Sequence, residues 1–196
     1  MSALAQITRR SQGGVSLLEV LVSILVFSVG ALGVAGLGVF SKRAAFDSVQ
    51  RGTAAEIAYG LLEEIRGNKT AIGSYLGATL GRGTRGTEPT ACNVPAAVCT
   101  AAEFASHSLW KWEQMLDTGM ETIGGAGTGG LLEPTACITG PAGGVAGDYL
   151  VTVVWLGSAT LTDPALNDCG AATGLYGTGN NQRRMVVVQS YIDPAL

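Results

Sequence analysis

The stretch "GGVSLLEVLVSILVFSVGALGVAGLGVF", residues 13–40, decides the fold of this chain. From Val15 to Phe40 its only charged residue is Glu19. A helix rises 1.5 Å per residue, so a helical segment of this length exceeds the roughly 30 Å thickness of the hydrocarbon core of a bilayer. The stretch therefore predicts an apolar helix that is long enough to cross a membrane.

Glu19 is the unexpected residue in this segment. A charge at the centre of a spanning helix costs roughly 2.5–3.5 kcal/mol on insertion scales, so such a residue usually has a function and a partner. Glu19 is near the start of the segment, however, and at the headgroup boundary a charge is tolerated at low cost. Whether the charge of Glu19 is merely tolerated at the membrane boundary or is paired with a positive charge depends on the neighbouring residues.

The apolar segment continues into "SKRAAFDSVQRGTAAEIAYGLLEEIRGN", residues 41–68, where apolar and charged residues alternate with helical spacing. The pattern predicts one helix from Val15 to about Arg66, with Gly67 and Asn68 as its stop. Four glycines interrupt the apolar part, and each costs up to about 1 kcal/mol relative to alanine. They predict either local bending or melting, or close packing against another helix. These glycines are Gly30, Gly33, Gly36 and Gly38.

Residues 67–99 are rich in glycine, threonine and proline and include "GATLGRGTRGTEP". They lack a phosphate-binding GxxxxGK[ST] pattern, so we interpret the glycines as flexible connection. Thr100 and Glu103 then form a capping box that predicts a short helix ending near Gly119. Trp110 and Trp112 on this helix cannot share one face, which makes an exposed tryptophan a candidate contact residue, although partial burial is more usual.

From residue 148 the chain has the composition of strands. "DYLVTVVWLG" and "RRMVVVQSYI" are rich in β-branched and aromatic residues, and a weaker "TACIT" precedes them. The segment 157–183 between the two long strands is expected to be a long loop. The order of long helix, short helix and small antiparallel sheet predicts an α+β fold, with the sheet packed on the amphipathic half of the first helix.

Four cysteines follow the apolar segment, and disulfides are the natural interpretation if that segment carries them into an oxidising compartment. Three pairings are possible. We favour Cys92 with Cys99, which closes a short loop, and Cys137 with Cys169, which clips a longer excursion. A zinc site is disfavoured because the sequence has no CxxC and its lone histidine, His107, lacks ligand-like spacing.

The remaining composition limits the function. The 29 glycines among 196 residues predict a loop-rich domain with a modest core, and the net charge of −3 argues against a general nucleic-acid-binding protein. The sequence has no G-x-S-x-G or H-E-x-x-H motif, and its acidic residues are dispersed. We therefore expect neither an enzyme nor a cofactor or metal site, and His107 is expected to be a surface or partly packed imidazole.

The residues around the start of the apolar segment carry a more specific signal. A short leader with Arg9 and Arg10, then Gly14, a hydrophobic residue, and Glu19 five positions after the glycine resemble the type IV prepilin family. The resemblance implies cleavage after Gly14 by a prepilin peptidase, methylation of the new amino terminus on Val15, and a role for Glu19 in subunit assembly. The chain departs from the family at Val15, where phenylalanine or methionine is usual.

The resemblance extends to the minor pilin branch called type IV pilus modification protein PilV, through "LVFSVGALGVAGL", "AAEIAYGLLEEIRGN", "LWKWEQML" and the two late strands. Major pilins generally carry a helix-bending proline at the twenty-second mature position, which here is Gly36. The branch implies a cleaved leader, residues 1–14, a transmembrane and filament-core helix, 15–40, and a globular pilin domain, 41–196.

The resemblance also implies location and partners. The chain would be held in the bacterial inner membrane with its C-terminal domain in the periplasm, and would then move to the pilus at the cell surface. It would contact other minor pilins, the major pilin and a possible tip adhesin, and would support adhesion and twitching motility. Two alternatives remain: a minor pseudopilin of a type II secretion system, and a membrane-anchored periplasmic binding protein that never polymerises.

Overall fold

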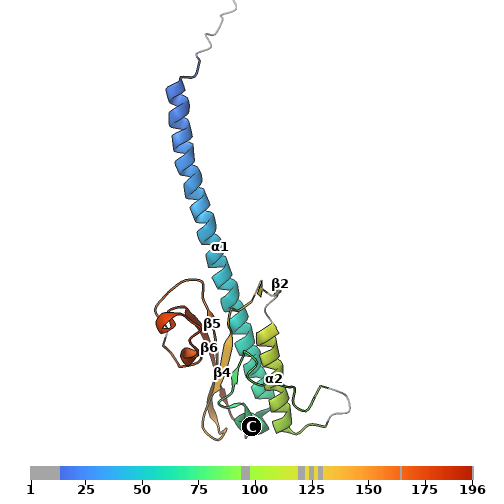
Figure 1. The fold of residues 1–196 in the computed structure, drawn as a ribbon. Helices are drawn as coiled ribbons and strands as arrows, with labels where there is room; N and C mark the ends of the chain where they lie inside the picture. The colour runs from blue at the N-terminus through green and yellow to red at the C-terminus, as the bar shows by residue number, and fades with distance from the viewer. Residues whose placement is uncertain are drawn as a thin grey trace, which may run out of the picture. The chain divides into compact units, whose positions relative to one another are not determined.

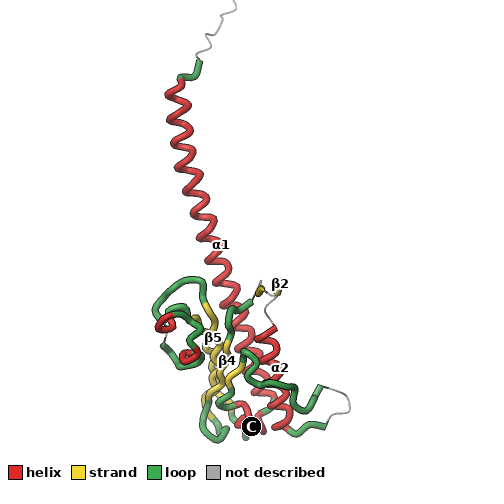
Figure 2. The backbone as a smooth tube through the Cα atoms, viewed as in Figure 1, coloured by secondary structure: helices red, strands yellow, loops and turns green. Residues whose placement is uncertain are grey.

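A computed structural model describes residues 14–93, 98–118, 122–123, 126–127, 130–163 and 165–195. The chain divides into two compact units, Met1–Ala44 and Ala45–Leu196. Figure 1 traces the elements in chain order, and Figure 2 distinguishes helices, strands and loops. The fold is α+β, as the sequence predicts: a long N-terminal helix, a short second helix and a small antiparallel sheet.

Helix α1 comprises Leu17–Gly67, 51 residues, and confirms the predicted helix to within two residues at each end. Asn68 follows it with a non-helical backbone, so Gly67 is the stop that the sequence indicates. Of the alternatives left open for the four glycines of the apolar part, melting is not observed, because the α-helix continues through all of them. A side chain added at any of them would meet nothing within 4 Å among the described residues.

In the first unit, the apolar side chains of α1 are exposed. Leu17, Phe27 and Leu32 keep between 74% and 78% of their surface accessible. By its length and composition α1 can cross a membrane, with a mean hydropathy of 2.5 over its most apolar window. Such a surface is unstable in water because each square ångström of exposed apolar area costs about 25 cal/mol.

In the second unit, α1 buries a stripe of side chains at helical spacing. These residues are Gln50, Ala54, Ala58, Leu61, Leu62 and Ile65. All except Gln50 belong to the main hydrophobic core, together with side chains of the sheet and of α2. The sheet therefore packs on the amphipathic half of the helix, as expected.

The sheet has four antiparallel strands in the order β1-β4-β5-β6. Their bounds are Thr79–Leu80 for β1, Thr135–Thr139 for β4, Gly147–Leu156 for β5 and Arg183–Ile192 for β6. Val151 of β5 pairs with Ile138 of β4 on one side and with Val188 of β6 on the other. The three predicted strands are thus confirmed, whereas β1 was not predicted. A separate two-stranded ribbon joins β2, Thr122–Ile123, to β3, Ala126–Gly127.

Strand β5 is buried on both faces. Val151, Val153 and Trp155 enter the main core, whereas Val154 lies in a second cluster with Cys169 and Tyr176. The second cluster is built by the loop between β5 and β6, which carries two short helices, Ala171–Thr173 (η2) and Thr178–Asn180 (η3) (Figure 2). The long loop therefore covers the sheet face opposite the helices and enlarges a modest core.

Helix α2, Ala101–Thr118, begins at the predicted capping box. The Thr100 backbone N–H and hydroxyl donate to Glu103 Oε2 at 2.8 and 2.9 Å, and the Glu103 N–H donates to Thr100 Oγ1 at 3.3 Å. These bonds lower the pKa of Glu103, chiefly through the backbone N–H. The capping box is confirmed as the start of this helix.

The interpretation of residues 67–99 as flexible connection is wrong for much of the segment. Lys69–Tyr75 forms a 3₁₀ helix, η1, and the turn after β1 is fastened to α2. Asp117 accepts hydrogen bonds from the backbone N–H groups of Arg82 and Gly83, at 2.5 and 2.7 Å. The glycine-rich sequence permits this turn, since Gly81 and Gly83 both have positive φ. The acceptors come from a distant helix, and local sequence does not reveal them.

Candidate processing and assembly segment

The residues that the resemblance identifies lie in and before the first turn of α1. Gly14, Val15 and Ser16 are exposed and non-helical, and helical structure begins at Leu17. The Ser16 carbonyl accepts the N–H groups of Glu19 and Val20, at 3.0 and 3.2 Å, and so starts the helical hydrogen-bond ladder. The peptide bond between Gly14 and Val15 therefore lies in accessible, non-helical backbone, the form of substrate that a peptidase can bind.

Glu19 occupies the first helical turn, where its negative charge interacts favourably with the positive end of the helix dipole. Its side chain is exposed, and among the residues that the structure describes nothing donates a hydrogen bond to its carboxylate or forms an ion pair with it. Ser23 Oγ donates to the backbone carbonyl of Glu19 at 2.7 Å, which leaves the carboxylate itself available. Chemically, the segment presents one accessible anion on an apolar helix.

Except for Gly14, the predicted leader, residues 1–14, falls outside the described residues. Arg9, Arg10 and Gly13 of the predicted signal belong to it. The geometry of the candidate segment thus rests on Gly14, Val15 and Glu19.

The four cysteines lie in the second unit and form the two predicted disulfides. Cys92 bonds to Cys99, with 5.8 Å between the Cα atoms, and Cys137 bonds to Cys169, with 5.9 Å. The second bond attaches the loop between β5 and β6 to strand β4 across 32 residues of sequence. On the entropic account of disulfides, closing a loop of this length stabilises the fold by about 4 kcal/mol.

A buried arginine reinforces the same attachment. Arg183 is 1% exposed, and its Nε and Nη1 donate to Asp163 Oδ1 and to the Cys169 carbonyl, each at 2.8 Å. Tyr176, also fully buried, places its hydroxyl 3.0 Å from Thr135 Oγ1 on β4. Burial raises the pKa of Tyr176 and keeps its hydroxyl neutral. The loop is therefore held by a covalent bond and by polar groups that are satisfied internally.

His107 is 5% exposed, and its Nδ1 lies 3.8 Å from Glu88 Oε1. Its ring stacks on Trp110 with 6.0 Å between the ring centroids, so it is a packed imidazole. Within the described residues, no group of three or more histidine, cysteine or acidic side chains is arranged to hold a metal ion. The histidine thus has a structural environment in this fold.

Sequence reasoning missed a second polar feature, the side chain of Arg85 in the turn after β1. Its Nε is buried and has no hydrogen-bond partner among the described residues. The only signal in the sequence was an arginine within a threonine- and glycine-rich segment, which is too common to single out a site.

Two family models match adjoining parts of the chain. The model described as prokaryotic N-terminal methylation motif matches residues 9–35, which include Gly14, Val15 and Glu19. The model described as type IV pilin Tt1218 matches residues 36–110, from the apolar part of α1 to the middle of α2. Comparison with curated proteins gave no match, and comparison with solved structures gave none.

The methylation motif covers the segment whose geometry is described above, and the pilin match begins where that motif ends. The proteins described by the second match are structural components rather than enzymes. The apolar helix and the methylation motif together indicate membrane anchoring, with a C-terminal domain outside the apolar phase. With its long N-terminal helix and small antiparallel sheet, the chain is a type IV prepilin-like protein.

Proposed function

We propose that this chain is a minor pilin of the type IV pilus, of the branch called type IV pilus modification protein PilV. It is a structural protein without enzymatic activity that helps to start pilus assembly in a tip or priming complex. One observation carries the proposal: the carboxylate of Glu19, which no described residue pairs with, lies in the first turn of an apolar helix, five residues after Gly14. The match to the type IV pilin model supports the pilus in preference to a type II secretion system, whose pseudopilins share the N-terminal signal.

In this proposal the chain has three parts. Residues 1–14 are a leader that prepilin peptidase removes, residues 15–40 are the transmembrane and filament-core helix, and residues 41–196 are the periplasmic globular domain. Before assembly the helix is held in the inner membrane. After extraction, the apolar side chains of residues 15–40, which are exposed among the residues that the structure describes, pack against the helices of neighbouring subunits.

Processing creates the partner of Glu19. Cleavage after Gly14 frees the amino group of Val15, which carries a positive charge and receives one methyl group. In a filament, this amino group of one subunit can face the carboxylate of Glu19 in the next. Two opposite charges 4 Å apart attract by about 4 kcal/mol at an effective dielectric constant of 20, before the cost of desolvation is subtracted. The pair would set the axial register of the subunits as well as strengthen their contact.

The minor role rests on sequence features. Gly36 stands where major pilins generally carry proline, so any bend at this position is left to glycine. The partners would be other minor pilins, the major pilin and a possible tip adhesin. Adhesion and twitching motility, the general roles of such pili, would then depend on this subunit through assembly.

The experiment is to replace the chromosomal gene by one encoding Glu19→Ala and to count pili per cell by electron microscopy. We expect pilus numbers to fall at least tenfold, because the intersubunit charge pair is lost while the leader and apolar helix remain. Ser23→Ala is the matched control: Ser23 is exposed one turn further along α1, and its hydroxyl bonds only to its own helix. Wild-type pilus numbers in the Glu19→Ala strain, with normal amounts of the protein, would contradict the proposal.

The same strains distinguish the pilus from a secretion system. If the chain were a pseudopilin, Glu19→Ala would reduce the amount of secreted enzymes in the medium and leave surface pili unchanged. If it were a binding protein that never polymerises, neither pili nor secretion would change.

A further inference from the structure

The turn after β1 is held in a fixed conformation by two acidic side chains of α2. Glu113 is fully buried, and its two carboxylate oxygens accept hydrogen bonds from Thr84 Oγ1 and from the backbone N–H of Arg85, each at 2.7 Å. Asp117, one helical turn further along, accepts the backbone N–H groups of Arg82 and Gly83. The backbone of Arg85 is therefore positioned without any contribution from its own side chain.

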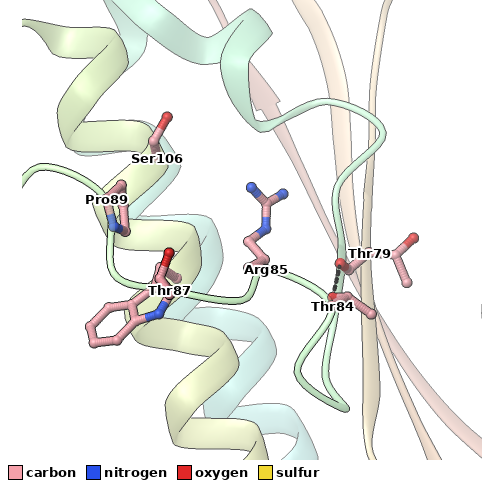
Figure 3. Close-up of a pocket in the computed structure, with 7 residues that line it drawn as sticks. Thr79, Thr84, Arg85, Thr87, Pro89 and Ser106 are labelled. Atoms are coloured by element: carbon pink, nitrogen blue, oxygen red, sulfur yellow. Dashed lines mark hydrogen bonds between the residues drawn. The ribbon is translucent and has the colours of Figure 1, made fainter.

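The guanidinium of Arg85 has no partner among the described residues. Its Nε is buried and makes no hydrogen bond, and no described acidic group forms an ion pair with it. A buried charged donor without a hydrogen-bond partner is costlier than a neutral one, so such a group calls for an explanation such as a ligand. In Figure 3 the guanidinium points away from the turn, into the space between Ser106 on α2 and Thr79 on β1.

This space is a cavity of about 280 Å³ with three kinds of lining. Arg85 supplies a positive charge, Thr87 and Ser106 supply hydroxyl groups, and Trp110 supplies an aromatic ring. The Trp110 Nε1–H donates to the Gly86 carbonyl at 3.3 Å, which holds the ring beside the turn. The volume is just below the usual range for sites that take drug-sized molecules and suits a smaller ligand.

We propose that this cavity binds a carboxylate-bearing sugar residue, such as the uronic acid unit of an acidic saccharide. The planar guanidinium of arginine matches a carboxylate and can bind it with two parallel hydrogen bonds. Threonine and serine hydroxyls both donate and accept hydrogen bonds, as ring hydroxyls of a sugar require. The Trp110 ring offers an apolar face with negative charge density to the C–H groups of the sugar.

A second cavity supports a saccharide rather than an isolated acid. It also measures about 280 Å³, and it shares Pro89 and Ser106 with the first. Thr90 of the loop and Ala102 and Glu103 of α2 complete its lining, so a neutral sugar unit suits this second space. The two adjoining spaces provide room for two consecutive sugar units, the acidic one beside Arg85.

This inference concerns ligand binding and is independent of the proposed role in pilus assembly. The test uses the full chain in detergent micelles and measures binding by calorimetry and by ligand-detected saturation-transfer NMR. The probe is the methyl glycoside of glucuronic acid. Its two reference ligands are the methyl glycoside of glucose, which lacks the carboxylate, and acetate, which lacks the sugar.

We expect saturable binding of the glucuronoside, at least tenfold tighter than that of either reference ligand. Arg85→Gln should weaken it at least tenfold. Arg82→Gln is the matched control: Arg82 is in the same turn, is exposed and lies 3.8 Å from Glu133, outside the cavity lining, so its loss should change affinity less than twofold. Because the Arg85 side chain has no described partner, we expect the Arg85→Gln fold to be unchanged, which circular dichroism checks.

A Trp110→Leu variant provides a second criterion. We expect it to weaken glucuronoside binding, with the NMR saturation signal falling most on the ring protons. Equal affinity for the glucuronoside and the glucoside would overturn the proposal, because the carboxylate would then have no role. Equal affinity for acetate would also overturn it, since the site would then recognise a bare anion. Absence of saturable glucuronoside binding to the folded chain would do so directly.

Discussion

The two halves of helix α1 have similar local structure and opposite environments. In residues 17–40 the large apolar side chains are exposed, whereas in residues 50–65 a stripe of six side chains is buried against the sheet and α2. The second half is stabilised within its own chain. The first half has an apolar surface that no other described residue covers. The same helix thus contributes to the core of the second unit in one half and presents, in the other, the surface to which we assign filament assembly.

The two glutamates at the starts of α1 and α2 also differ in whether they have a partner within the described chain. Glu103 bonds to the Thr100 residue of its own capping box, and these bonds lower its pKa. Glu19 has the same position in a first helical turn but has no described partner for its carboxylate. A satisfied acidic residue contributes to folding, and an unsatisfied one is available to another molecule.

The largest difference in folding stability should be between two leucine substitutions, one in each half of α1. Leu61→Ala removes a side chain that is 1% exposed and should lower the free energy of unfolding of the second unit by about 2–5 kcal/mol. Leu25→Ala, at a position that is 66% exposed, should change it by less than about 0.5 kcal/mol. Urea titration in detergent, followed by tryptophan fluorescence, measures this unit selectively because all three tryptophans lie in it. Equal losses in the two variants would contradict the contrast.

A smaller effect should come from glycine substitutions, which test packing without removing any atoms. A Cβ at Gly60 would lie 2.5 Å from Trp112 Cη2, and the Trp112 Nε1–H is hydrogen-bonded to Glu64, so the ring cannot easily withdraw. Gly60→Ala should therefore destabilise the second unit by about 1–3 kcal/mol.

Gly33→Ala is the matched control for that substitution. It meets no atom within 4 Å and should leave the unfolding of the second unit unchanged in the same urea titration. If Gly60→Ala were neutral or stabilising, the close packing of α2 on α1 would be contradicted.

The smallest effect should come from the glutamates. Because the folded pKa of Glu103 is lowered, its stabilising contribution is present above its unfolded value near 4.5 and is lost as the pH falls through the folded pKa. Glu103→Gln should reduce stability slightly at pH 7, and the difference from the wild type should disappear in acid. Glu19→Gln should leave the stability of the second unit unchanged at every pH. Urea titrations at pH 7 and below pH 4 measure the stability difference between the wild type and Glu103→Gln. A difference of the same size at both pH values would contradict the prediction.

Much of this architecture could be predicted because it depends on local signals. The extent of α1 follows from a continuous apolar and then amphipathic pattern, the start of α2 from Thr100 and Glu103, and the three longer strands from β-branched runs. The Gly14, Val15 and Glu19 signal is likewise contained within six residues.

The features that escaped prediction depend on distant partners. Strand β1 has two residues and exists because it pairs with β4, more than fifty positions along the chain. The turn that carries Arg85 is ordered by Glu113 and Asp117, whose acidity in the sequence suggests only a solvated helix face. The glycines of α1 left local melting and close packing as alternatives. The helix continues through them, because each residue added to a long helix forms a further backbone hydrogen bond that offsets the low helix propensity of glycine.

The most direct test of the central claim is intact-mass and N-terminal analysis of the mature protein purified from pili or membranes. We predict a chain that lacks residues 1–14 and begins at Val15 with one added methyl group, so that Glu19 is the fifth residue from a newly created, charged amino terminus. A mature protein that retains the leader, or that is cut within or after the apolar helix, would contradict the account.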